Sequence, residues 1–227
     1  NFGDTLNAGG IDFIYAQTND ALGKIDTVNV KTGNPEIIGS FKEDFGDTDD
    51  DIEAYLDYAA QAGYRHIILA GHSLGANKVI YYLSRHHDAR VEHFLLLSPA
   101  NLTHMTSDTS EQEKQIVRQR VASGRGQEFL PFYFMGWLPC YADTAYQWLF
   151  TDTLKNVHVE KDGDFSQCEE ITHTGALLIG TYDRFTYGDP AGFLKNINDH
   201  LPTARQNKLI FIEKTGHTYQ QKEQEVA

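Results

Sequence analysis

The segment Gly71 to Gly75 has the sequence GHSLG and lies between an apolar run and an amphipathic stretch. The preceding residues, His66 to Ala70 (HIILA), are typical of a central parallel strand that is buried on both faces. The following residues, 76–85, have the apolar spacing of a helix. A serine in a sharp turn between a strand and a helix needs small neighbours, because the two backbones approach closely there. Gly71 and Gly75 meet that need, so this context predicts a nucleophile elbow with Ser73 at its tip.

Strands and helices alternate along the rest of the chain. Further apolar strands are predicted at 94–97, 176–179 and 209–212, and a helix at about 191–200. This alternation predicts an α/β fold with a mostly parallel central sheet and helices on both faces. Residues 11–16 (IDFIYA) are expected to add a buried strand, and residues 25–41 a β-hairpin at the surface; residues 111–121 are expected to form a polar amphipathic helix.

Another helix is predicted from Thr48 to Gly63, with Thr48 as its N-cap. Three aspartates, 49–51, follow Thr48. Carboxylates are favoured at the positive end of a helix dipole, so we attribute the aspartates to helix capping rather than to metal binding.

Charge and cysteine content narrow the choice of partners and compartment. The chain has 19 Lys and Arg against 32 Asp and Glu, a net charge of −13. Such a field opposes binding to nucleic acid or to an anionic membrane and favours neutral or cationic small molecules. The two cysteines, Cys140 and Cys168, have no nearby His or Cys at zinc-ligand spacing and are expected to be thiols in a reducing compartment, the cytoplasm. Nothing in the sequence indicates an oligomeric state.

A serine nucleophile requires an imidazole base and a carboxylate that orients the base. His217 follows the predicted strand 209–212, and Asp183 follows the strand 176–179, so both are expected at the carboxyl edge of the sheet. Asp189 is the alternative acid, although Asp183 lies closer to the rigid end of its strand. His173 and His200 are alternative bases, although only His217 follows a final strand after the acid. The backbone N–H of Leu74 is expected to donate to an oxyanion.

With these motifs, GHSLG at 71–75, GTYD at 180–183 and TGH at 215–217, the chain resembles the α/β-hydrolase superfamily from about residue 11 onwards. The run GHSLGANKVIYYLSR, followed by LLLSPANL, resembles a bacterial subgroup that is similar to fungal siderophore-type esterases. The resemblance implies a serine hydrolase that cleaves carboxylic esters through an acyl-enzyme, with no metal and no organic cofactor. An acyltransferase, or a peptidase or amidase, would use the same triad, and a non-catalytic binding protein is a further alternative on this fold.

The resemblance also sets expectations for domain organisation. In the superfamily a second oxyanion donor comes from a glycine-containing loop after a strand that precedes the one expected at 11–16; its absence here suggests that N-terminal strands are missing and that the true N-terminus lies upstream of Asn1. We expect a single domain over 1–227 with a helical lid inserted at about 111–172. The lid is rich in aromatic residues, of which three are candidate pocket walls: Trp137, Tyr146 and Trp148.

Overall fold

The computed structural model describes residues 2–226, which form two compact units. The first, called here the sheet unit, contains the chain up to Ala16, Leu56–His104 and the chain from Leu154 onwards. The second, the aromatic unit, contains Gln17–Tyr55 and Met105–Thr153. The single domain with a lid at about 111–172 stays a prediction.

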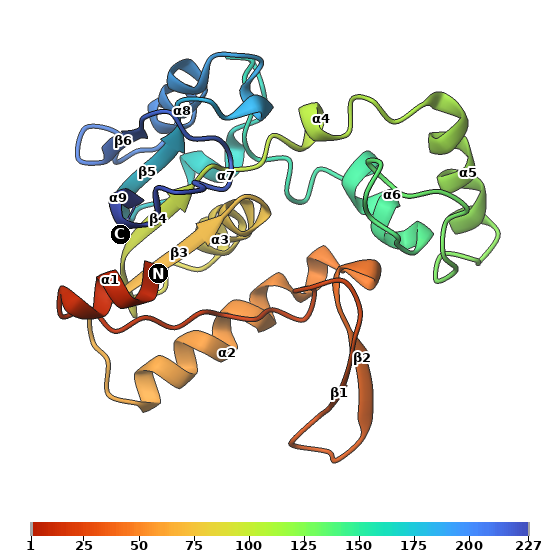
Figure 1. Cartoon of the computed structure of the whole chain (residues 1–227), viewed down its shortest axis with the longest axis horizontal. Coiled ribbons are helices and arrows are strands. Elements are labelled where there is room, and N and C mark those ends of the chain that lie inside the picture. The colour runs from red at the N-terminus through yellow and green to blue at the C-terminus, as the bar shows by residue number, and fades with distance from the viewer. Residues whose placement is uncertain (1, 227) are drawn as a thin grey trace. The chain divides into compact units, whose positions relative to one another are not determined.

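The sheet unit is built on four strands, which are all parallel and follow the order β3-β4-β5-β6 (Figure 1). They are β3 (Ile67–His72), β4 (Val91–Leu97), β5 (Thr174–Gly180) and β6 (Lys208–Ile212). This arrangement confirms the predicted α/β class with a parallel sheet. Because the strands are parallel, all four carboxyl ends lie at one edge, and the segments that follow them meet there.

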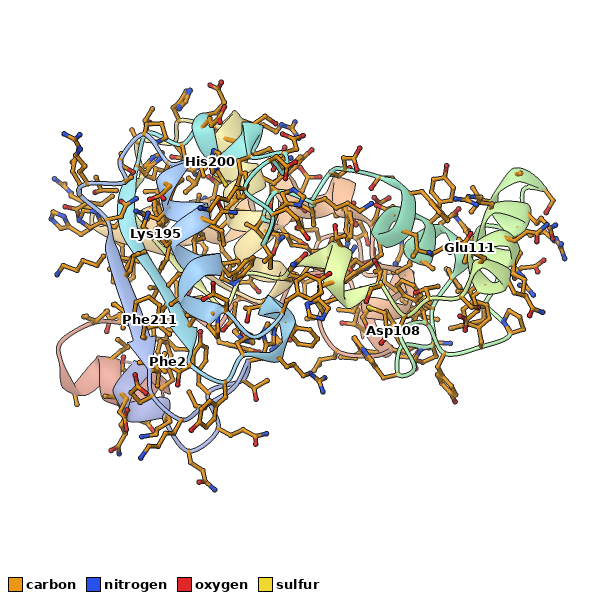
Figure 2. The ribbon with its side chains drawn as sticks, turned by 90° about the horizontal axis from the view of Figure 1, so that it is seen from above. Phe2, Asp108, Glu111, Lys195, His200 and Phe211 are labelled. Carbon is orange, nitrogen blue, oxygen red and sulfur yellow. The ribbon has the colours of Figure 1, made fainter. Side chains whose placement is uncertain are left out.

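Two longer helices cover this sheet. Helix α3 (Leu74–Arg85) packs against β3 and β4, and α8 (Pro190–Asp199) packs against β5 and β6. Figure 2 shows Lys195 on α8, His200 just beyond the end of that helix and Phe211 on β6. The shorter helices of this unit are α1 (Phe2–Ala8), α7 (Ser166–Glu169) and α9 (Glu223–Val226), and α4 (Leu102–Met105) begins in it.

Two expectations about strands are wrong. Strand β3 exists, but among residues 2–226 it pairs only with β4, so it is an edge strand and its Ile68 side chain is 52% exposed. Ile11–Ala16 form no strand and are exposed, because none of the described strands pairs with this segment. A β-branched, aromatic run becomes a strand only where a neighbour takes up its backbone hydrogen bonds.

The aromatic unit combines a hairpin with helices. Strands β1 (Ile25–Val28) and β2 (Pro35–Ile38) pair antiparallel, which confirms the predicted hairpin. Two 3₁₀ turns, Ser40–Lys42 and Phe45–Asp47, lead into α2 (Thr48–Gln61), which continues into the sheet unit. Helices α5 (Glu111–Ala122) and α6 (Ala142–Phe150) complete the unit. Thr48 is the first residue of α2, not its N-cap, because its hydroxyl donates to the carbonyl of Phe45 at 2.8 Å instead of accepting from the helix.

Aromatic side chains form much of the core of this unit. Phe45 and Phe134 both lie against Trp148, with ring centroids 6.0 and 6.4 Å away. The Trp148 indole N–H donates to the buried carboxylate of Glu43 at 2.9 Å. Trp148 is therefore a core residue of the aromatic unit, whereas Trp137 is 60% exposed.

None of the helices within residues 2–226 has the length and hydrophobicity needed to span a bilayer.

Candidate active site

Ser73 occupies the sharp turn between β3 and α3. Its backbone has φ 54° and ψ −126°, a conformation that non-glycine residues rarely adopt and that is concentrated at functional sites. The Ser73 N–H donates to the carbonyl of Leu97 at 3.0 Å, which extends the pairing of β3 with β4 up to the turn. The turn therefore holds the serine at the carboxyl edge of the sheet.

The two glycines of the motif differ in the space around them. A Cβ on Gly71 would lie 2.2 Å from the carbonyl oxygen of Gly75, so the predicted need for a small residue is confirmed at Gly71. A Cβ on Gly75 would have no atom within 4 Å outside its own helix backbone and chain neighbours, and Gly75 has no positive φ. The expected steric need is therefore wrong for Gly75, because the close approach at the turn is directed at the α-carbon of Gly71.

The structure brings Ser73, His217 and Asp183 into one chain of hydrogen bonds. The Nε2 atom of His217 lies 2.8 Å from the Ser73 Oγ, and its Nδ1 lies 2.8 Å from the Asp183 Oδ2. Three different strands, β3, β5 and β6, lead into the segments that carry these side chains. The tautomer with a proton on Nδ1 donates to the carboxylate and leaves Nε2 free to accept from the serine hydroxyl.

Asp183 is 3% exposed and is held by several donors. Its Oδ1 accepts the N–H of Phe185 at 3.0 Å, in addition to the bond between its Oδ2 and His217. Burial alone would raise the pKa of Asp183, but the hydrogen bond and charge of His217, the Phe185 N–H and the Ser98 hydroxyl lower the pKa overall. The carboxylate is thus stabilised in the ionised form that an orienting acid requires.

The alternative acid and the two alternative bases form hydrogen bonds with other groups. The carboxylate of Asp189 caps α8 by accepting the N–H of Gly192 at 2.8 Å. His200 lies 3.3 Å from a carboxylate oxygen of Glu169, and His173 Nε2 lies 3.2 Å from the carbonyl of Asp88. Of the two candidate acids, Asp183 is the one beside His217.

Leu74, the expected oxyanion donor, is the first residue of α3. The first N–H groups of a helix have no carbonyl four residues earlier within that helix, and they carry the positive end of its dipole. This position fits the expected role, in which the Leu74 N–H would stabilise negative charge next to Ser73.

Sequence reasoning missed three side chains around this group. The Ser98 hydroxyl, just beyond the end of β4, lies 2.7 Å from the Tyr219 hydroxyl, which itself donates to the carbonyl of Leu178 at 3.0 Å. The Nε2 of His72 lies 2.7 Å from the carbonyl oxygen of His217, and since a carbonyl has no proton, this nitrogen is the donor. The position of Ser98 directly after an apolar strand was the one signal that pointed to the same edge.

The two cysteines are unpaired and buried. Burial raises the pKa of Cys140 and of Cys168 to about 12. Neither thiol is therefore an activated nucleophile. Within the part of the chain that the structure describes, no group of three or more His, Cys, Asp or Glu side chains is arranged to hold a metal ion.

Comparison with protein families shows which family the chain belongs to. The model of the family described as "Protein of unknown function (DUF1749)" matches residues 36–167, more than half of the chain. The chain belongs to this family. The segment that matches the DUF1749 model contains Ser73, and Asp183 and His217 lie beyond its end. No curated protein matches the chain.

Several solved structures are similar to this DUF1749 chain in fold. A monoacylglycerol lipase from Paleococcus ferrophilus has a TM-score of 0.59 at 15% identity, over 95% of this chain and 79% of the lipase. The alpha/beta hydrolase GrgF from Penicillium sp. has a TM-score of 0.57 at 13% identity, over 84% of this chain and 72% of GrgF. A putative hydrolase from Agrobacterium vitis has a TM-score of 0.53 at 17% identity, over 98% and 76% of the two chains. The fold is that of the α/β hydrolases, as the sequence resemblance predicted.

Proposed function

We propose that this protein is a serine hydrolase that cleaves carboxylic esters through an acyl-enzyme intermediate. The observation that carries the proposal is the continuous chain of hydrogen bonds from Ser73 through His217 to Asp183, with both distances at 2.8 Å. A serine hydroxyl is a weak nucleophile at neutral pH, and this arrangement supplies the base and the orienting acid that it needs. Further support comes from the strained turn at Ser73 and from the α/β-hydrolase fold.

The chemistry follows from the positions of the protons. His217 Nε2 takes the proton of the Ser73 hydroxyl as Oγ attacks the ester carbonyl, and the tetrahedral oxyanion receives the N–H of Leu74. The protonated imidazole, stabilised by Asp183, then gives that proton to the leaving alcohol. Water repeats the sequence: His217 takes a proton from water, the hydroxyl attacks the acyl-enzyme carbonyl, and the proton returns to Ser73 Oγ as the acid leaves.

Labelling with a fluorophosphonate tests the proposal. We expect the reagent to modify Ser73, located by peptide mapping, and we expect Ser73→Ala to lose labelling and to reduce the kcat for p-nitrophenyl acetate by roughly 10⁴- to 10⁶-fold. Ser84→Ala is the matched control, because the Ser84 hydroxyl lies further along α3 and donates only within that helix, to the carbonyl of Tyr81. Retention of esterase activity in Ser73→Ala would refute the proposed mechanism.

Labelling and product analysis together separate the alternative functions from the esterase. A non-catalytic binding protein would not react with the fluorophosphonate. An acyltransferase would pass the acyl group from labelled substrate to a second alcohol, and a peptidase or amidase would release an amine. Product analysis with an ester, an amide and an added alcohol acceptor therefore identifies which acyl chemistry the triad performs.

The net charge of −13 supports small, soluble substrates that are neutral or cationic. A panel of esters that differ in acyl length and charge tests this part, and faster cleavage of long-chain triglyceride emulsions than of soluble short esters would contradict it. The motif resemblance to siderophore-type esterases adds ester siderophores to the panel.

We further propose that the protein works in a reducing compartment, the cytoplasm, on the grounds that Cys140 and Cys168 are unpaired.

A further inference from the structure

The segment that carries His217 reaches across the carboxyl edge of the sheet. In the order β3-β4-β5-β6, the strand that leads to His217 is three places from the strand that leads to Ser73, which is about 14 Å at the usual strand spacing of about 4.8 Å (Figure 1). His217 lies only five residues beyond Ile212, the end of β6. Its imidazole nevertheless bonds to the Ser73 hydroxyl at 2.8 Å. A short segment therefore has to be held towards β3 for this bond to form.

Two hydrogen bonds fix the segment on either side of His217. The carbonyl of Thr215 accepts the N–H of Tyr182, which follows β5, at 2.9 Å. The hydroxyl of Tyr219 donates to the carbonyl of Leu178, near the end of β5, at 3.0 Å. Both bonds hold the segment to β5. Neither of them reaches β3 or fixes the peptide group of His217 itself.

A third bond reaches His217 from β3. His72 is the last residue of that strand and directly precedes Ser73. Its Nε2 donates to the carbonyl oxygen of His217 at 2.7 Å. Neighbouring side chains of a strand point to opposite faces, so His72 and Ser73 reach the same residue only because the backbone turns sharply at Ser73, where φ is 54° and ψ is −126°. Two consecutive residues thus hold His217, one by its main chain and one by its side chain.

The donor role of His72 does not depend on the charge of its ring. A neutral imidazole with its proton on Nε2 and a protonated imidazole both present an N–H at that atom. Partial burial of the ring lowers the pKa of His72, although the bond to the His217 carbonyl acts in the opposite direction. At neutral pH we therefore expect the neutral ring, with its proton on Nε2.

We propose that His72 is a positioning residue that holds the peptide group of His217 and so directs the His217 imidazole towards Ser73. This inference rests on the proposed function of Ser73, His217 and Asp183. The carbonyl carbon and the Cβ of His217 are bonded to the same α-carbon, so a shift of the carbonyl moves the imidazole with it. A catalytic group has to be held within about 0.5 Å of its productive position. The bond from His72 supplies this restraint on the side of the segment that faces β3.

Two substitutions of His72 and a matched control test the inference. His72→Phe keeps a flat ring and removes the donor. His72→Gln keeps a donor, because the Nε2 of glutamine is separated from its α-carbon by as many bonds as the Nε2 of histidine. His173→Phe is the control: the Nε2 of His173 lies 3.2 Å from the main-chain carbonyl of Asp88, but His173 directly precedes β5, at the amino edge of the sheet. This variant removes the same kind of bond at the opposite edge from Ser73.

Two rates are measured for each variant: fluorophosphonate labelling of Ser73, and exchange with water of the His217 Nδ1 proton, which NMR detects in ¹⁵N-histidine-labelled protein. That proton lies in the bond to Asp183, so its exchange reports how well the imidazole is held. The bond from His72 is accessible to water, so the loss of an ordinary hydrogen bond is expected: in His72→Phe, labelling should be about two- to tenfold slower and exchange faster by a similar factor. His72→Gln should restore both rates to within about twofold of the wild type. His173→Phe should change neither rate.

The position of the proton on His72 is a direct test that needs no variant. The ¹⁵N shifts of the wild-type protein at neutral pH should show His72 protonated on Nε2, and a proton on Nδ1 alone would overturn the inference even if His72→Phe does not fold. Wild-type rates in His72→Phe would overturn it as well. The same holds for equal losses in His72→Phe and His72→Gln, which would indicate a packing role for the ring, and for an equal loss in His173→Phe, which would indicate general loosening.

The two rates separate failure of this inference from failure of the proposed function. If wild-type protein is labelled at Ser73 and His72→Phe is labelled equally fast, the positioning role is wrong and the hydrolase stands. If wild-type protein is not labelled, the proposed hydrolase is wrong, and exchange of the Nδ1 proton decides the rest. Faster exchange in His72→Phe that His72→Gln reverses supports the positioning role, and equal exchange in all three proteins refutes it.

Discussion

Substitution of Gly71 and of Gly75 by alanine should have opposite effects on the free energy of unfolding. A Cβ added at Gly71 would lie 2.2, 2.4 and 2.6 Å from the O and C atoms of Gly75 and the N of Ala76. All three are backbone atoms in the first turn of α3, where the Ala76 N–H donates to the Ser73 carbonyl at 2.9 Å. No side-chain rotation relieves such a clash. Gly71→Ala therefore forces the start of α3 to move away from β3.

The magnitude follows from these contacts. Overpacking a tightly packed site costs about 1–3 kcal/mol, and the backbone clash at Gly71 places Gly71→Ala at the upper end of that range. Gly75→Ala adds a Cβ in open space within a helix, where alanine is preferred to glycine by up to about 1 kcal/mol. We therefore expect the two variants to differ by about 2–4 kcal/mol in the free energy of unfolding, with opposite signs relative to the wild type.

Urea denaturation followed by circular dichroism measures this difference, and fluorophosphonate labelling of each variant reports on Ser73. Gly71→Ala should unfold at lower urea and label more slowly, because the displaced turn moves Ser73 Oγ away from His217. Gly75→Ala should be at least as stable as the wild type. Equal stabilities for the two variants, or a more stable Gly71→Ala, would show that the backbone of Gly75 and Ala76 does not exclude a Cβ at position 71.

Four further substitutions, two of them controls, test the acid and the core of the aromatic unit. Asp183→Asn should reduce the labelling rate by about 10³- to 10⁴-fold, whereas Asp189→Asn should not, because its amide oxygen still caps α8. Folding lowers the pKa of Asp183 from 3.8. The ionised carboxylate therefore contributes to stability above about pH 4, and this contribution is lost as the pH falls through the pKa of the folded state. Between about pH 5 and 3, the urea midpoint should decrease less in Asp183→Asn than in the wild type. Trp148→Phe removes a donor to the buried Glu43 and should lower the free energy of unfolding, measured by urea denaturation, by about 1–3 kcal/mol. Trp137 is exposed, so the control Trp137→Phe should change the free energy of unfolding by less than about 0.5 kcal/mol.

The parallel sheet was predictable because continuous apolar runs mark its strands. The predicted strands at 94–97, 176–179 and 209–212 lie within β4, β5 and β6, which are one to three residues longer at their ends. Hydrophobicity alone does not tell a central strand from an edge strand, so Ile68 was expected to be buried and is exposed. The same ambiguity explains residues 11–16: strand propensity is local, but pairing depends on a partner elsewhere in the chain.

The residues of the candidate site were predictable to different degrees for a physical reason. Ser73 lies in a local motif, and Asp183 and His217 follow apolar strands, so their meeting at one edge required only that the strands be parallel. The choice between Asp183 and Asp189 needed the structure, because it depends on where a loop places each carboxylate. Asp183 is held by the Phe185 N–H two residues later, and Asp189 caps the helix that follows it.

The contacts of Ser98 could not be predicted from motifs, because its hydroxyl bonds to Tyr219 and its N–H to the carbonyl of Leu178, two residues far from it in the sequence. A lone serine after a strand is typical of many turns, and only its buried bond to the Tyr219 hydroxyl distinguishes it. Its positive φ would suit glycine, which adopts such a conformation at no steric cost. A serine there carries strain that glycine would avoid, and its buried hydroxyl is bonded to that of Tyr219. The strained residues Ser73 and Ser98 directly follow β3 and β4, at the edge of the sheet that also carries Asp183 and His217, and strained backbone of this kind is concentrated at functional sites.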